Sequence, residues 1–131
     1  MEIKQAYFAV LEKTRKEHPD ALIYAVSRRL SRWQSKERQM ELLTSQLIEL
    51  APSERLHMDQ YKKLITWDQF TERFIEEIKK SENAQKTLRE LIEKSKTNEI
   101  FLVCHEGPKQ GKSCHRFILL DMIKQIEERS L

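Results

Sequence analysis

The sequence predicts an α/β fold: a single compact domain, residues 1–131, whose mostly parallel sheet is flanked by helices in a three-layer α/β/α arrangement. Two apolar segments, 21–27 and 99–104, have the composition of buried strands, and helical patterns separate them. Strands that alternate with helices are typical of a parallel sheet. A length of 131 residues fits one domain, and no linker or low-complexity segment divides the chain.

The amino-terminal part of the chain is expected to begin with two strands. Residues 4–10 are rich in aromatic and β-branched side chains, which favours a strand, although the helix formers after Leu11 also fit a helix that reaches Arg15. A His-Pro-Asp segment at 18–20 breaks the chain. The near-continuous apolar run 21–27 then predicts a strand that is buried on both faces.

Helical patterns fill the middle of the chain. Apolar residues from Met40 to Leu50 recur at helical spacing until Ala-Pro-Ser at 51–53 interrupts them. Ser53 is placed to cap a short helix, and Thr66 with Gln69 has the spacing of a capping box. Helices are therefore expected over 37–50, 53–64, 66–80 and 84–94, with Phe70, Phe74, Ile78, Leu88, Leu91 and Ile92 facing inward.

The last strand and the last helix enclose the candidate functional site. Residues 99–104 form the clearest strand, and a helix from Ser113 or Cys114 to Glu128 is expected to bury Phe117, Leu120, Ile123 and Ile126. The loop between them, 104–116, contains both cysteines, both glycines and two of the four histidines. Because ligands gather beyond the carboxyl ends of parallel strands, this loop is the candidate site.

Composition and charge narrow the function classes. No apolar run approaches the roughly 20 residues of a membrane-spanning helix, and the first residues lack the pattern of a secretory signal, so we expect a cytoplasmic protein with no membrane partner. The 24 basic and 21 acidic residues give a net charge of +3, which does not favour a nucleic-acid partner. Two cysteines are too few for a disulfide scaffold. The sequence indicates neither a cofactor nor an oligomeric state.

The loop has the features of an anion site. At the start of a helix, unpaired backbone amides and the helix dipole favour negative charge. Gly107 and Gly111 allow backbone amides to converge, and Lys109, Lys112 and Arg116 add positive charge. The spacing matches neither a Walker A loop nor a dinucleotide fingerprint. The expected ligand is therefore a small anion, such as a phosphate, a carboxylate or a nucleotide.

Cys114 is the candidate nucleophile. It is expected in the first turn of the last helix, near Lys112, His115 and Arg116, all of which favour a thiolate. Cys104 is either a resolving thiol for Cys114 or the last buried residue of its strand, since free cysteine is among the most buried residue types. The sequence leaves both roles of Cys104 open.

The same residue types also suit a metal ion. Cys104, Cys114 and His115, with His105 or Glu106, offer ligands for zinc or iron. However, the spacing is not that of a zinc finger or ribbon, and neighbouring side chains such as Cys114 and His115 point in different directions on a helix. No residue is therefore assigned as a metal ligand.

Three arginines, Arg28, Arg29 and Arg32, follow the second strand. If this strand and the strand that ends at Cys104 are parallel neighbours, these arginines flank the loop, where a guanidinium suits bidentate recognition of carboxylate or phosphate. Pairing with surface glutamates is the alternative, and it is favoured for Arg32.

Other aromatic and histidine side chains are expected to be structural. Trp33, Trp67, Phe70 and Phe74 are assigned to the core, because helical spacing already explains the last three. His57 has no neighbour in the sequence that suggests a role.

Several segments resemble the bacterial and archaeal family named domain of unknown function 488. That family typically carries a late strand ending in Leu-Leu-Cys and a Cys-His-Arg that opens the next helix; here Phe-Leu-Val-Cys at 101–104 and Cys-His-Arg at 114–116 are similar. Residues 6–9, 23–28 and 49–53 also resemble segments of the family. The resemblance implies a compact α/β domain with its candidate site at these loops, and it favours a strand for the amino-terminal segment. It supplies no reaction.

We therefore predict a small cytosolic α/β protein that binds an anionic ligand, with thiol-dependent activity, at the loop 104–116. The catalytic residues are expected to be Cys114, His115 and Arg116. The ligand-binding residues are expected to be Arg28, Cys104, Glu106, Lys109 and Lys112, of which Glu106 positions a cation. The alternative is a non-enzymatic metal- or redox-responsive module that uses the two cysteines and His115.

Overall fold

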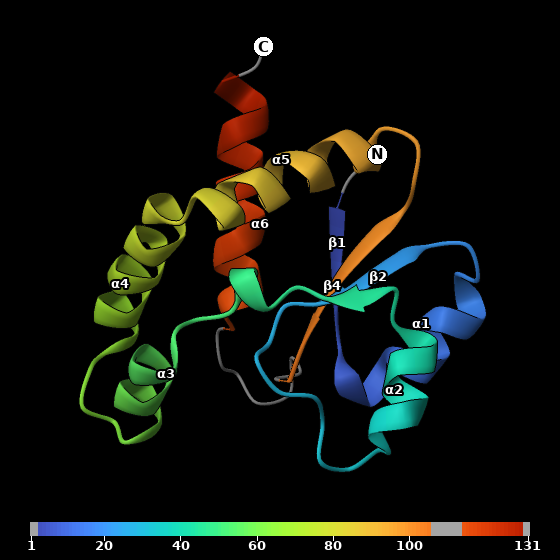
Figure 1. Ribbon diagram of the computed structural model, residues 1–131, viewed down its shortest axis with the longest axis horizontal. Helices are drawn as coiled ribbons and strands as arrows, with labels where there is room; N and C mark the ends of the chain where they lie inside the picture. Colours follow the sequence, from blue (N-terminus) through green and yellow to red (C-terminus); the bar gives the residue numbers. More distant parts are fainter. Residues whose placement is uncertain (1–2, 106–113, 130–131) are drawn as a thin grey trace.

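A four-stranded parallel sheet forms the centre of the computed structural model, which describes residues 3–105 and 114–129 (Figure 1). Its strands are β1 (Ile3–Tyr7), β2 (Leu22–Ala25), β3 (Ser45–Gln46) and β4 (Ile100–Cys104). The order across the sheet is β1-β4-β2-β3, and every pairing is parallel. The predicted α/β class with a parallel sheet is confirmed. β4, the last strand in the sequence, lies between β1 and β2.

Helices cover both faces of the sheet. One face packs against α3 (Glu54–Tyr61), α4 (Trp67–Lys80), α5 (Glu82–Ser95) and α6 (His115–Arg129), and the other against α1 (Leu11–Glu17) and α2 (Lys36–Leu42) (Figure 1). Residues of β4 alternate between these two cores: Leu102 and Cys104 face the first, whereas Phe101 and Val103 face the second. This alternation directs the side chain of Cys104 toward α6.

The amino-terminal segment combines both structures that its sequence allowed. The strand stops at Tyr7, a 3-10 turn covers Phe8–Val10, and α1 follows directly. Phe8 and Leu11, three residues apart, are both buried in the second core. Their spacing suits a helical turn, so the chain leaves the sheet earlier than the predicted strand 4–10.

The predicted helix 37–50 is wrong beyond Leu42. α2 ends there, and the chain then adds the edge strand β3 through hydrogen bonds from Thr44 N to Ile23 O at 2.7 Å and from Leu47 N to Ala25 O at 2.7 Å. The apolar residues that suggested one long helix belong to different layers. Leu42 and Leu43 lie in the second core, whereas Leu50 lies in the first.

The remaining helices match the predictions closely. Ser53 caps α3, and Thr66 and Gln69 form the expected capping box of α4. α6 begins one residue later than predicted. Of its predicted inward residues, Ile123 is buried and Leu120 and Ile126 pack against the core, but Phe117 is 41% exposed, so that assignment is wrong. The inward positions of α6 are Ile118, Leu119, Met122 and Ile123, together with His115 and Arg116 of the first turn. Both of these polar residues turn toward the interior in the first turn of α6.

The assignment of Trp33 to the core is wrong. Its side chain is 94% exposed, in the loop between β2 and α2. Gln39 fills the interior position instead: it is fully buried, accepts from Ser31 N at 2.8 Å and donates to Ser31 O at 2.9 Å. A side-chain amide therefore satisfies the loop backbone, and the indole is left outside.

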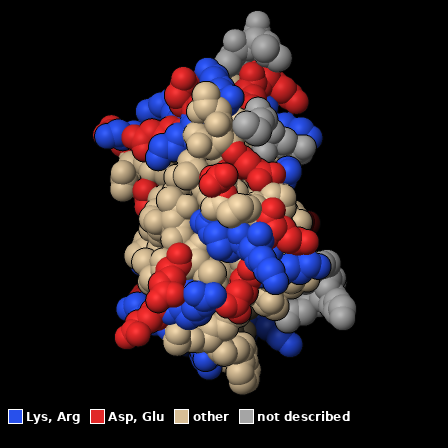
Figure 2. Space-filling model, turned by 90° about the vertical axis from the view of Figure 1, so that its right-hand side faces the viewer, with Lys and Arg blue, Asp and Glu red and all other residues tan. Residues whose placement is uncertain are grey.

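The surface carries charges of both signs. On the face shown in Figure 2, Lys and Arg lie interspersed with Asp and Glu, as expected from the near balance of the composition. Among the described residues, no helix is long and apolar enough to cross a membrane.

The two aromatic positions give a direct stability comparison. Phe74 is fully buried between neighbouring aromatic rings, so Phe74→Ala should lower the free energy of unfolding by about 3–5 kcal/mol. Trp33→Ala should change it by less than about 0.5 kcal/mol, since its ring is exposed. Urea unfolding followed by circular dichroism measures both; a larger loss from the Trp33 variant would contradict this packing.

Candidate functional site

Three side chains meet where the chain leaves β4 and enters α6. Cys104 is the last residue of β4, Cys114 immediately precedes α6, and His115 is its first residue. The segment after β2 lies beside them, because β2 and β4 are parallel neighbours and Val26 N donates to Val103 O at 2.9 Å. The expectation that this strand and its arginines flank the end of β4 is confirmed for the backbone.

His115 lies between the two sulfurs. Its Nδ1 is 3.6 Å from Cys104 Sγ and 3.7 Å from Cys114 Sγ, and the three ligand atoms lie within 4.8 Å of one another. Its Nε2 lies 2.6 Å from the carbonyl oxygen of Val26. A carbonyl only accepts, so Nε2 carries a proton, and this hydrogen bond turns Nδ1 toward the two sulfurs.

This cluster is buried and packed against an aromatic ring. Cys104, Cys114 and His115 are only 4%, 5% and 8% exposed. The ring of Phe74 packs edge-on against the imidazole, with 5.5 Å between centroids. In such surroundings each polar contact is stronger than in water, and each missing contact is more costly.

The two sulfurs differ in charge state. A hydrogen bond from Cys104, assisted by His115 and by the backbone amide of Arg116, lowers the pKa of Cys114 to about 3 in spite of its burial. The same hydrogen bond to Cys114, together with desolvation, raises the pKa of Cys104 well above its usual value. The pair therefore consists of a Cys114 thiolate and a Cys104 thiol that donates to it.

Arg116 brings a permanent positive charge to the same region. Its side chain is 1% exposed, Nε donates to Gln5 Oε1 at 2.9 Å, and the guanidinium carbon lies 4.5 Å from the centroid of the Phe117 ring. Nη1 has no hydrogen-bond partner among the described residues. Because arginine stays protonated, its charge opposes in part the rise in the pKa of Cys104 that the hydrogen bond to Cys114 and desolvation cause.

Further basic groups surround this end of the sheet. The pKa of His57, on α3, is lowered by burial and by the positive charges of Arg29, His115, His105 and Arg28. No local pattern in the sequence points to His57, because only the fold brings α3 beside the segment after β2. The Arg28 guanidinium donates to Pro52 O at 3.4 Å, which holds it near the start of α3.

Of the other predicted residues, His105 and Arg28 are described, and both lie apart from the cluster. His105 is exposed on the opposite face of β4, where Nε2 donates to Arg29 O at 2.7 Å and the ring packs 4.8 Å from Phe8. Glu106, Lys109 and Lys112 lie outside the described residues. Arg28 is exposed at the rim. Among the described residues its guanidinium donates to Pro52 O and makes no hydrogen bond to either sulfur.

The side chains of Cys114 and His115 do not point in different directions, so that expectation is wrong. Cys114 precedes the helix, so its side chain does not follow the helical rotation that separates adjacent residues. Both its sulfur and the imidazole of His115 therefore turn toward Cys104.

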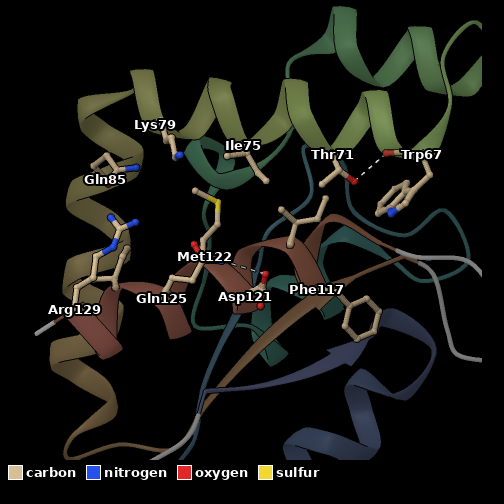
Figure 3. A pocket seen from close by; sticks show the side chains of 12 residues that line it. Trp67, Thr71, Ile75, Lys79, Gln85, Phe117, Asp121, Met122, Gln125 and Arg129 are labelled. Atoms are coloured by element: carbon tan, nitrogen blue, oxygen red, sulfur yellow. Dashed lines mark hydrogen bonds between the residues drawn. The ribbon is translucent and has the colours of Figure 1, made fainter. Parts of the chain in front are cut away.

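A pocket of about 680 Å³ lies elsewhere, between α4, α5 and α6 (Figure 3). Trp67 and Phe117 line one end, and Lys79 and Arg129 line the other. None of the lining residues is cysteine or histidine. The cysteine and histidine side chains of the candidate site therefore do not open into this pocket.

A comparison with family models identifies a relationship over most of the chain. The model DUF488-N3a, described as the active DUF488-N3 subclade, matches residues 7–127. Comparisons with curated proteins and with solved structures find no match. The family match confirms the resemblance that the cysteine and Cys-His-Arg segments suggested.

The support of Arg116 by Gln5 can be tested by stability. Gln5→Leu removes the acceptor of a buried charged N–H, so the free energy of unfolding should fall by about 1–3 kcal/mol. Gln125→Leu, an exposed change on α6, should cost less than about 0.5 kcal/mol. Equal urea midpoints for the two variants would show that Arg116 does not depend on Gln5.

Proposed function

The chain belongs to the DUF488 family, and we propose that it carries out thiol-dependent chemistry on a small anionic substrate at the Cys104–Cys114–His115 cluster. Cys114 is the nucleophile, His115 the base and Arg116 the anion-holding residue. The observation that carries the proposal is the chain of contacts from Cys114 Sγ to His115 Nδ1, and from His115 Nε2 to the Val26 carbonyl.

This chain of contacts has the parts of an activated thiol. A nucleophile needs a base within reach, and the base needs a third group that orients it. In the resting site the proton of Cys114 has already passed to Nδ1 of His115, so the Cys114 thiolate forms the bond to the electrophilic centre of the substrate directly. The bond to the leaving group breaks, and the imidazolium returns the proton to that group. Cys104 faces the same sulfur and stabilises its charged form.

The anionic character of the substrate is inferred from the surrounding charge. Arg116 is a buried guanidinium whose hydrogen-bonding acceptor among the described residues, Gln5, is neutral. Arg28, Arg29 and His57 lie close enough to interact electrostatically with one another at the rim. A carboxylate or phosphate suits such a set of donors. The subclade description, active, is compatible with a site that performs chemistry.

We also propose a reducing, cytoplasmic setting. Both cysteines are free although their sulfurs lie within 4.8 Å of each other. Two thiols at such a short distance stay reduced in a compartment buffered by glutathione and thioredoxin.

Alkylation with a charged and a neutral reagent tests the thiol and the anion together. At pH 7 with a chelator present, Cys114 should react faster than glutathione with iodoacetamide, as located by mass spectrometry. It should also prefer iodoacetate over iodoacetamide by about tenfold more than glutathione does, which corresponds to about 1.4 kcal/mol of charge attraction. Inorganic phosphate should slow the reaction with iodoacetate.

Matched variants separate the two parts of the proposal. Arg116→Met should remove the preference for iodoacetate, whereas Arg129→Met, at the far end of α6, should retain it. If the Arg116 variant does not fold, protection of the wild type by phosphate still decides the question. A folded protein whose Cys114 reacts no faster than glutathione would refute the nucleophile, and an unchanged reagent preference would refute the anion site.

A further inference from the structure

The three cluster side chains also converge as a set of soft and borderline metal ligands. Cys104, Cys114 and His115 each turn one ligand atom inward, and these atoms lie within 4.8 Å of one another. In a tetrahedral zinc site with usual bond lengths, a sulfur and a nitrogen lie about 3.6 Å apart. The two sulfur–nitrogen distances here are 3.6 and 3.7 Å.

We infer that Cys104 Sγ, Cys114 Sγ and His115 Nδ1 bind one Zn²⁺ ion, and that the bound metal withdraws Cys114 from thiol chemistry. The metal site rests on its own geometry, and only the effect on Cys114 rests on the proposed function. The cluster therefore has two states, one with the metal ion bound and one without it, and Cys114 is reactive only in the state without the metal.

The orientation of His115 supports a metal ligand. Ligating histidines usually donate their other ring N–H to a carbonyl or carboxylate, which fixes the tautomer and the ring plane. Here Nε2 donates to Val26 O at 2.6 Å, so Nδ1 is already turned toward the sulfurs. The ring is also held by Phe74, whose centroid lies 5.5 Å away. The nitrogen ligand therefore needs no rearrangement.

The choice of zinc follows from the ligand types. Two thiolates and an imidazole are soft or borderline ligands, which select zinc over magnesium or calcium. On binding, the protons held by Cys104 Sγ and His115 Nδ1 pass to solvent, and the two resulting thiolates neutralise the charge of the divalent ion, as burial at 4% and 5% exposure requires. Three protein ligands are the number that catalytic zinc sites use, and the fourth position then takes water or another ligand.

Cobalt substitution gives a direct spectroscopic test on the wild-type chain. Co²⁺ added to metal-free protein should produce the thiolate-to-metal charge-transfer absorption and the intense visible bands of tetrahedral coordination, and these should saturate at one ion per chain. One equivalent of Zn²⁺ should displace the cobalt spectrum. The same equivalent should slow iodoacetamide alkylation of Cys114 by about tenfold or more, because the free thiolate is the nucleophile.

Variants identify the ligands. Cys104→Ser, Cys114→Ser and His115→Ala should each lose the cobalt spectrum, whereas His105→Ala and His57→Ala should keep it, since His105 lies on the opposite face and His57 belongs to the rim. Circular dichroism confirms folding of each variant. If a ligand variant does not fold, the wild-type spectrum and its one-to-one saturation remain decisive.

The outcomes for the two proposals differ. Absence of the charge-transfer absorption in the wild type, or alkylation that Zn²⁺ does not slow, overturns the inference and leaves the thiol proposal standing. The other outcome is a protein that gives the cobalt spectrum but whose metal-free Cys114 is alkylated more slowly than glutathione. This result supports the metal site. It overturns the claim that the metal withdraws a reactive thiol, and it refutes the proposed thiol function.

Discussion

The hydrogen bond from His115 Nε2 to Val26 O, at 2.6 Å, is the contact on which the arrangement of the site depends. It joins the first residue of α6 to the chain just beyond β2, although the two residues are 89 positions apart. It also holds a proton on Nε2 and orients the ring so that Nδ1 faces both sulfurs. One backbone carbonyl thereby fixes the position of the helix start, the orientation of the ring and the chemistry that the ring offers.

The central place of β4 makes that contact possible. Because β4 pairs with β2 on one side and β1 on the other, its carboxyl end lies between both neighbouring strand ends. Strand alternation then sends Cys104 toward α6 and His105 to the opposite face. A shift of one residue in β4 would exchange the two side chains and remove a sulfur from the cluster.

Local signals in the sequence were sufficient for most elements and for the place of the site, but not for its geometry. The capping box of Thr66 and Gln69, and the apolar run of β4, depend on neighbours in the sequence and were predictable. The short edge strand β3 was not, because only its pairing with β2 defines it. His57 and the exposure of Trp33 likewise depend on contacts between distant segments. The convergence of both sulfurs on His115 could not be predicted without knowing that Cys114 precedes the helix.

Arg116 indicates that this site is not arranged for stability alone. A buried guanidinium with a neutral acceptor is costly, and apolar residues of similar volume often replace buried charges without loss of stability. The charge of its guanidinium also acts on the cysteine cluster, where it opposes the rise in the pKa of Cys104. The cation and the cluster are therefore electrostatically linked. A chain that keeps both in its interior retains a charge separation that its core packing does not need, and such departures from packing rules are expected at functional sites.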